Sequence, residues 1–245
     1  MLLHENFVFL HVPKTGGRFI RQMLSHEIPS CQSLPTHAAH WGWRQIPSAA
    51  ADRPVLAFVR NPWDWYVSWY SFLMERPPSW FAELQLTNRF LSRLLLDTST
   101  LPTDPSSAYT IRVNDFATTV KLACGGLIHG TGPGDLQDLV AGLDLEKPLL
   151  EGHDFYTARL LTILGEGLNS RQLTIGRFES IPDDLASFMH QAGIDLSDEA
   201  IKRLHSTNPI GRSDRRPYRH YYDRALQELV GDSCNAVIDR FGYAY

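Results

Sequence analysis

The chain has 245 residues, of which 43% are hydrophobic and 20% are charged, as in an ordinary globular protein with one substantial core. Its formal net charge of −4 gives no basic excess, which argues against a nucleic-acid-binding protein. The three cysteines, Cys31, Cys124 and Cys234, are too sparse for a disulfide scaffold and too far apart for a metal knuckle. No run of about 18 apolar residues occurs. We therefore expect a single domain over residues 1–245, a cytoplasmic location, and neither a transmembrane segment nor a metal site.

The first informative stretch begins with the apolar residues 7–12, which predict a short buried strand. Pro13 ends the strand, and Lys14, Thr15, Gly16 and Gly17 follow before a helical pattern over 19–24. A strand, a glycine-bearing turn with a lysine and a helix together aim backbone N–H groups at one point, which favours an oxyanion. The nucleotide P-loop spacing Gly-x4-Gly-Lys-Ser/Thr is absent, because the lysine precedes the glycines. An ordinary turn that contains these residues is the alternative.

A second buried strand is predicted over 54–59, and Arg60 follows it directly. Asn61 can cap the next helix, predicted over 62–73, with Pro62 at its first position. Arg60 then lies at the carboxyl end of a strand, where α/β sheets place ligands, and Ser68 lies about two helical turns further on. These two side chains can converge on one anion. The alternative is an arginine salt bridge and a serine that bonds to its own backbone.

The rest of the chain predicts further elements. Two histidines, His37 and His40, lie with two tryptophans in the segment 36–43 that follows the first helix, and each is a candidate base or a structural hydrogen-bonding residue. Patterning predicts helices over 80–96, 109–126, 136–143, 153–164, 182–192 and through 226–238, and a strand over 172–178. The glycine-rich segment 125–134 predicts a mobile connection that could serve as a substrate lid.

Two stretches resemble signatures of the sulfotransferases that use 3′-phosphoadenosine 5′-phosphosulfate (PAPS), in the order found in that family. The stretch His-Val-Pro-Lys-Thr-Gly-Gly resembles their 5′-phosphosulfate loop, and Val-Arg-Asn-Pro-Trp-Asp-Trp-Tyr-Val-Ser resembles their 3′-phosphate signature. The C-terminal residues 208–222 and a terminal Phe-Gly-Tyr are similar to bacterial and carbohydrate O-sulfotransferases, although the spacing from Asn208 to Ser213 is longer. The resemblance implies an α/β fold with a central, mainly parallel sheet flanked by helices, related to the P-loop nucleotide kinases.

The resemblance also implies roles for individual residues. It makes Lys14 a catalytic residue that neutralises the oxygen bridging sulfur and phosphorus, and it makes His37, with His40 second, the general base. The residues implied to bind the nucleotide are Lys14, Thr15, Gly16, Gly17, Arg18, Arg60, Ser68, Ser213, Arg216 and Tyr218. The implied cofactor is PAPS, with the product 3′-phosphoadenosine 5′-phosphate (PAP), and no metal is required.

The resulting functional prediction is transfer of a sulfuryl group from PAPS to a hydroxyl of an acceptor. The acidic balance of the chain favours a small glycan, lipid or hydroxylated metabolite over a long sulfated polysaccharide. Two alternatives stay open, an atypical P-loop kinase that uses ATP and Mg²⁺ and a non-catalytic protein that binds PAP. The first is disfavoured by the missing Gly-Lys-Ser/Thr, and the second would lack a working base.

Overall fold

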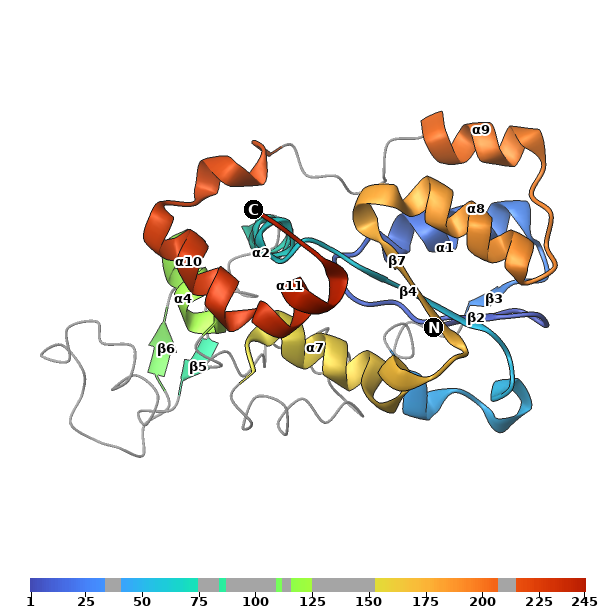
Figure 1. The fold of residues 1–245 in the computed structure, drawn as a ribbon, viewed down its shortest axis with the longest axis horizontal. Coiled ribbons are helices and arrows are strands. Elements are labelled where there is room, and N and C mark those ends of the chain that lie inside the picture. The colour runs from blue at the N-terminus through green and yellow to red at the C-terminus, as the bar shows by residue number, and fades with distance from the viewer. Residues whose placement is uncertain (34–40, 75–83, 87–108, 112–115, 125–152, 207–214) are drawn as a thin grey trace, which may run out of the picture. The chain divides into compact units, whose positions relative to one another are not determined.

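A computed structural model of the chain describes residues 1–33, 41–74, 84–86, 109–111, 116–124, 153–206 and 215–245 (Figure 1). These residues belong to two compact units. The first unit combines Met1–Arg60 with Leu160–Arg212, and the second combines Asn61–Arg159 with Ser213–Tyr245. The single domain over residues 1–245 stays a prediction.

The first unit is built on a five-stranded sheet with the order β3-β1-β2-β4-β7. Its strands are β1 (Leu2–Leu3), β2 (Val8–Phe9), β3 (Gln32–Ser33), β4 (Val55–Val59) and β7 (Leu173–Arg177). Strands β2, β4 and β7 pair in parallel, whereas β1 is antiparallel to both of its neighbours. The predicted central, mainly parallel sheet is thus confirmed. The first predicted strand is shorter than expected, since β2 covers two residues of the range 7–12.

The parallel register determines which segments meet at the edge of this sheet. Val59, the last residue of β4, is paired with Arg177, the last residue of β7. On the other side of β4, the Leu10 N–H donates to the Leu56 carbonyl at 2.8 Å, just beyond the end of β2. Because parallel strands end at the same edge, the segments that follow β2, β4 and β7 start next to one another.

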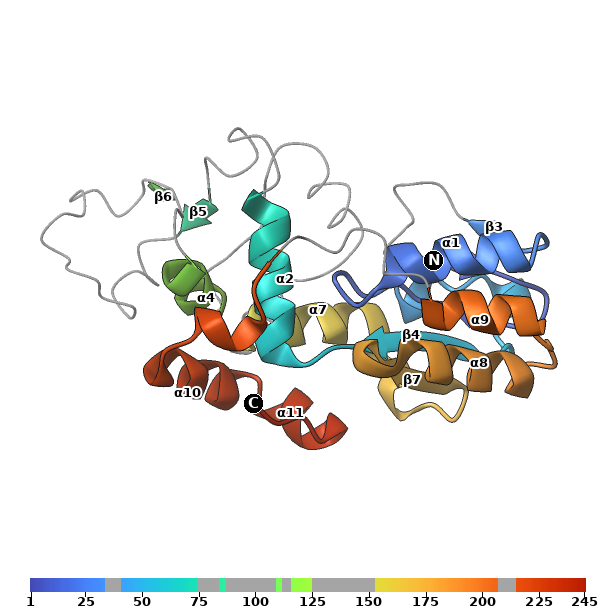
Figure 2. The same cartoon turned by 90° about the horizontal axis from the view of Figure 1, so that it is seen from above.

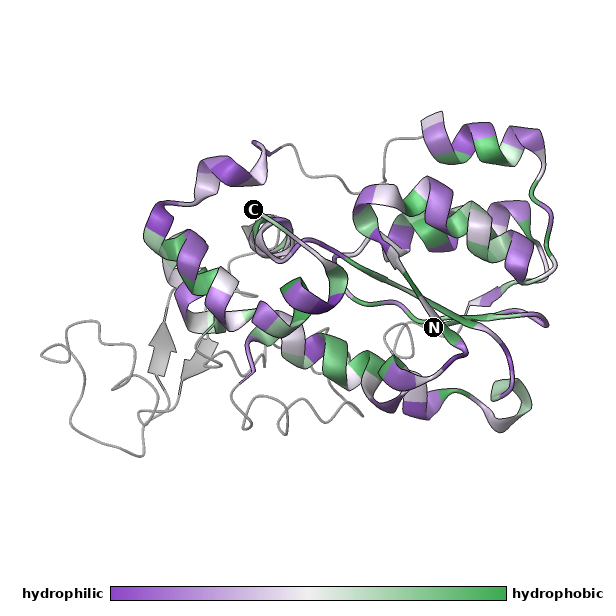
Figure 3. Cartoon of the chain, viewed as in Figure 1, coloured by the Kyte–Doolittle hydropathy of each residue, from purple (hydrophilic) through white to green (hydrophobic). Residues whose placement is uncertain are grey.

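Three helices pack on this sheet through one apolar core. They are α1 (Gly17–Glu27), α8 (Ile181–Gln191) and α9 (Asp198–Ser206), and Figures 1 and 2 show them on the same face of the sheet. Phe9 and Phe58 from the strands meet Ile20 from α1 and Phe188 from α8 in the core. In Figure 3, hydrophobic and hydrophilic residues alternate along each of these helices, as expected for helices that bury one apolar face against a core. Short 3-10 helices complete the unit, namely η2 (Trp43–Gln45), η3 (Ser48–Ala50), η6 (Gly165–Asn169) and η7 (Phe178–Ser180).

The second unit is mainly helical. It contains α2 (Pro62–Met74), α4 (Phe116–Cys124), the start of α7 (Phe155–Leu164), η8 (Tyr218–Tyr221), α10 (Arg224–Ser233) and α11 (Asn235–Phe241), with the antiparallel pair β5 (Leu84–Leu86) and β6 (Tyr109–Ile111). The predicted cap of α2 is confirmed, since the Asn61 side-chain oxygen accepts a hydrogen bond from the Trp63 N–H at 3.0 Å.

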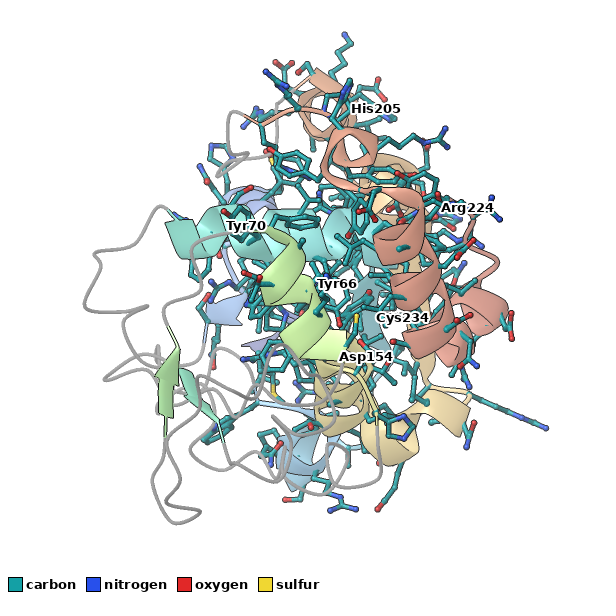
Figure 4. All side chains as sticks on the ribbon, turned by 90° about the vertical axis from the view of Figure 1, so that its left-hand side faces the viewer. Tyr66, Tyr70, Asp154, His205, Arg224 and Cys234 are labelled. Atoms are coloured by element: carbon teal, nitrogen blue, oxygen red, sulfur yellow. The ribbon has the colours of Figure 1, made fainter. Side chains whose placement is uncertain are left out.

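The core of the second unit holds a buried carboxylate. Asp154 precedes α7, and its Oδ1 accepts hydrogen bonds from the Tyr66 hydroxyl at 2.7 Å and from the N–H groups of Tyr156 and Thr157 at 2.9 and 3.2 Å. Figure 4 shows Tyr66 pointing toward Asp154 in this interior. Burial, followed by the charge of Asp154, raises the pKa of Tyr66, so the phenol remains a proton donor. Trp65, which stacks on Tyr156 at 4.6 Å, lies next to this group.

Two predicted helices are wrong in part. The range predicted as a helix over 80–96 contains strand β5, and the range 109–126 begins with strand β6 before helix α4. Leu-Gln-Leu pairs with Tyr-Thr-Ile here, and the second segment has the β-branched and aromatic residues that favour a strand. An apolar pattern this short does not distinguish a strand from a helix. The predictions for 136–143 and for 125–134 lie outside the described residues.

Candidate anion-binding site

The loop between β2 and α1 has an unusual backbone conformation. Lys14 has a φ of 66° and Gly16 a φ of 83°, and Lys14 is the non-glycine residue with positive φ in the described part of the chain. The Thr15 hydroxyl, which is buried, donates to the Val12 carbonyl at 2.8 Å and so closes the turn on itself. The left-handed region costs a lysine roughly 1 kcal/mol, so surrounding contacts must hold this conformation.

Both glycines of the loop have close neighbours. A Cβ added to Gly17 would lie 1.8 Å from Cδ2 of His11, and one added to Gly16 would lie 2.5 Å from Cδ1 of Ile181. The His11 ring is held in place because it is buried and stacks on Phe9 with ring centroids 6.3 Å apart. The loop is therefore packed against its own strand on one side and against the start of α8 on the other.

Helix α1 presents a positive N-terminus. Its N-cap is Gly16, which has no side chain to cap the first N–H groups, and no acidic residue lies in its first turn. The first helical bond runs from the Ile20 N–H to the Gly16 carbonyl. Arg21 lies on the second turn, and its buried Nε has no hydrogen-bond partner among the described residues. Burial, followed by the charge of Arg18, lowers the pKa of Arg21.

Arg60 lies beside this loop. It follows β4, is 5% exposed, and its Nη1 donates to the Lys14 carbonyl at 2.9 Å. Its guanidinium carbon lies 3.8 Å from the centre of the Phe178 ring, in the segment that follows β7. The first unit thus brings Lys14, the two glycines and Arg60 together at the carboxyl edge of the sheet, as predicted for strands that end side by side.

Other predicted site residues lie in the second unit or outside the described residues. Ser68 is on α2 and is buried, Arg216 is exposed, and Tyr218 is half-buried on η8. His37, His40 and Ser213 lie outside the described residues. The roles of all these residues, and those of Thr15 and Arg18, stay predictions.

The C-terminal segment of the second unit is fastened to the first turn of α2. Arg215 forms an ion pair with Asp64 at 2.6 Å, and both side chains are largely buried. The Tyr222 hydroxyl donates to the Trp63 carbonyl at 2.8 Å. Arg216 and Tyr218 lie in sequence between these two anchors.

Two residues that support the loop were not singled out from the sequence. His11 fills the space over Gly17, and Phe178 stacks on Arg60. The signal for Phe178 was available, because two neighbouring parallel strands of equal length place the residues that follow them side by side. The pattern around His11 holds no comparable signal, since the contact depends on the three-dimensional path of the turn.

The described residues hold no group of three His, Cys, Asp or Glu side chains that could bind a metal ion. All three cysteines are free, and burial raises the pKa of Cys31 to about 11 and that of Cys124 to about 12, so these thiols are poor nucleophiles near neutral pH. In the described part of the chain, no helix has both the length and the apolar character needed to cross a bilayer.

Comparison with known proteins places the fold. No family model and no curated protein matches the chain. The structure is similar to the crystal structure of a mouse sulfotransferase, SULT7A1, complexed with PAP, with a TM-score of 0.52 and 14% sequence identity over 98% of this chain and 87% of the mouse chain. The chain therefore has a sulfotransferase-like α/β fold.

Proposed function

We propose that the protein transfers a sulfuryl group from PAPS to a hydroxyl group of a small glycan, lipid or hydroxylated metabolite, in the manner of bacterial and carbohydrate O-sulfotransferases, and that it acts in the cytoplasm. The observation that carries the proposal is the meeting of Lys14 and Arg60 at the open N-terminus of α1. The PAP-bound mouse sulfotransferase of similar fold supports it.

The residues of the loop suit the 5′ end of such a donor. The N–H groups of the first turn of α1 and the left-handed Gly16 leave room for an oxyanion without a competing side-chain cap. PAPS, when bound, supplies the sulfuryl group and a phosphate leaving group. Lys14 then holds positive charge beside the oxygen that bridges sulfur and phosphorus, where negative charge develops as that bond breaks.

The acceptor hydroxyl must lose a proton as its oxygen attacks the sulfur. We assign this proton to an imidazole, with His37 first and His40 second, because the intrinsic pKa of histidine suits a base near neutral pH. Arg60, Ser68, Ser213, Arg216 and Tyr218 are assigned to the remainder of the nucleotide, including its 3′-phosphate. The protein mainly aligns the reactants and stabilises charge, so it needs no metal ion.

A binding experiment separates this proposal from the alternatives. We expect PAP to raise the melting temperature of the protein more than ADP does, and ATP with Mg²⁺ to give no larger shift than ADP. A larger shift with ATP and Mg²⁺ would favour a kinase. PAP binding without turnover of PAPS in the presence of any hydroxylated acceptor would favour the non-catalytic alternative.

Two substitutions then test the chemistry. Lys14→Ala should lower turnover by ~10²–10³-fold, the usual effect of losing one preorganised group that stabilises developing charge. His37→Ala should abolish turnover and leave PAP affinity intact. Normal turnover of the His37→Ala protein would transfer the role of base to His40, and normal turnover of both single variants would refute the use of an imidazole base.

A further inference from the structure

Arg60 has a second contact that a phosphate ligand does not need. Its Nη1 donates to the backbone carbonyl of Lys14 at 2.9 Å. That carbonyl belongs to the residue held at a φ of 66°, and it immediately precedes the Thr15 N–H of the loop. A hydrogen bond to this oxygen fixes the plane of the Lys14–Thr15 peptide, and a bond from a guanidinium is stronger than one between neutral groups.

Phe178 restrains the arginine from the other side. The guanidinium carbon lies 3.8 Å from the ring centre, within the range of a cation–π contact. The same ring approaches the loop, because a Cβ on Gly16 would lie 3.2 Å from Cδ2 of Phe178. In the β4–β7 register Val59 pairs with Arg177, so the next residues, Arg60 and Phe178, lie beside each other. The pairing of the two strands therefore fixes the backbone position of Phe178.

These contacts connect three strand ends to one backbone conformation. The left-handed backbone conformation costs a lysine conformational free energy. The hydrogen bond described to the Lys14 carbonyl comes from Arg60, which Phe178 in turn restrains. We propose that Arg60, backed by Phe178, is a positioning residue that holds Lys14 in its left-handed conformation and thereby shapes the 5′ anion cradle, independently of any contact between Arg60 and a 3′-phosphate. This role rests on the proposed function, and it is additional to the contact of Arg60 with the 3′-phosphate proposed there.

Two nucleotides separate the positioning role from a simple phosphate contact. PAP carries a 3′-phosphate and a 5′-phosphate, whereas ADP lacks the 3′-phosphate and carries a 5′-diphosphate. We expect Arg60→Met to weaken binding of both PAP and ADP by about tenfold or more in calorimetric titrations, as for loss of a bond from a charged donor. If Arg60→Met weakens PAP binding and leaves ADP binding unchanged, Arg60 acts on the 3′-phosphate alone and the inference is wrong.

A kinetic readout reports on Lys14 itself. With water as nucleophile, the attacking oxygen bonds to sulfur, the bond from sulfur to the bridging oxygen breaks, the nucleotide phosphate leaves with that oxygen and the water proton goes to solvent. We expect Arg60→Met to slow this hydrolysis at saturating nucleotide by ~10²-fold, the usual cost of a misplacement near 1 Å. The loss should be the same with PAPS and with adenosine 5′-phosphosulfate, which has no 3′-phosphate. A loss confined to PAPS overturns the positioning role.

Matched variants keep the test interpretable. Ser68→Ala changes a residue assigned to the 3′-phosphate and should affect PAP and PAPS without affecting ADP. Arg53→Met removes another arginine-to-carbonyl bond of the first unit, from Arg53 Nη1 to the His4 carbonyl at 2.6 Å, and should leave nucleotide binding unchanged.

If Arg60→Met does not fold, Phe178→Leu tests the same clamp with the arginine in place. A weaker but equal loss with PAP and ADP supports the positioning role, and unchanged binding of both overturns it. Failure of the unaltered protein to bind PAP at all would instead refute the proposed function.

Discussion

Two glycines in helices should respond in opposite ways to replacement by alanine. Gly17 is the first residue of α1 and Gly231 lies within α10, and neither has a positive φ. Helix propensity alone predicts that alanine stabilises a helix interior by roughly 0.5–1 kcal/mol over glycine. The surroundings of the two residues differ sharply, and the surroundings should decide the sign.

The magnitude follows from the space around each Cβ. On Gly17 the Cβ would lie 1.8 Å from Cδ2 and 2.2 Å from Nε2 of His11, so the ring must move by roughly 1.5 Å to reach an ordinary contact. The ring is buried against Phe9 and cannot turn into solvent, so overpacking of about 1–3 kcal/mol should exceed the gain in propensity. On Gly231 the nearest atom is Cζ2 of Trp63 at 3.6 Å, an ordinary contact, so the gain in propensity should survive.

Urea denaturation measures both changes as shifts in the midpoint at constant m-value. We expect Gly17→Ala to lower the free energy of unfolding by about 1–2 kcal/mol and Gly231→Ala to raise it by about 0.5 kcal/mol. Adding His11→Ala to Gly17→Ala should cost less than the two single losses combined, because the clash is gone. A Gly17→Ala protein as stable as the unaltered one, or purely additive losses, would show that the ring does not constrain Gly17.

Further outcomes follow from buried groups of the second unit. Tyr66→Phe should lower the free energy of unfolding by about 1.5–3 kcal/mol in urea denaturation, since the buried Asp154 loses a donor at 2.7 Å, whereas Tyr245→Phe, which loses a 3.3 Å bond at an exposed position, should change it little. Burial raises the pKa of Cys124 from 9.0 to about 12. Between these pH values the unfolded state binds fewer protons than the folded state, so stability should fall as pH rises, by at most about 1.4 kcal/mol per pH unit, and unfolding curves for Cys124→Ala should show a shallower fall. At pH 8 a disulfide reagent should label Cys124 and Cys234 only in denaturant, and labelling of the native protein would contradict their burial.

The parts of the fold that sequence predicts well are those with long, unambiguous patterns. Helix α2 has Asn61 and Pro62 at its start and a continuous apolar and aromatic run, and its predicted limits agree with the structure to within one residue. Strand β4 is an apolar run buried at every residue. By contrast, β5 and β6 are three residues long, and their identity as strands depends on pairing with each other, a contact that no local pattern encodes.

The site divides in the same way. Residue types and order predict that the segments carrying Lys14 and Arg60 lie side by side, because each follows a strand and parallel strands end together. The bond from Arg60 to the Lys14 carbonyl could not be predicted, since it depends on a backbone conformation that lysine seldom adopts. The contact of His11 with Gly17 likewise depends on how closely the turn brings the two residues together. That distance is fixed by packing in the folded chain, so the local sequence pattern does not predict it.

The Lys-Thr-Gly-Gly motif alone does not determine the backbone conformation of this loop. Thr15 closes the turn with a bond inside the loop, but that bond joins residues three positions apart and leaves φ of Lys14 undetermined. The contact that reaches the Lys14 carbonyl comes from Arg60, 46 residues later in the chain, and the ring behind Arg60 comes from the far end of β7. The same four residues placed after another strand would lack both contacts, and lysine would return to the more favourable right-handed or extended regions. The proposed anion cradle thus depends on the edge of the sheet as well as on the motif.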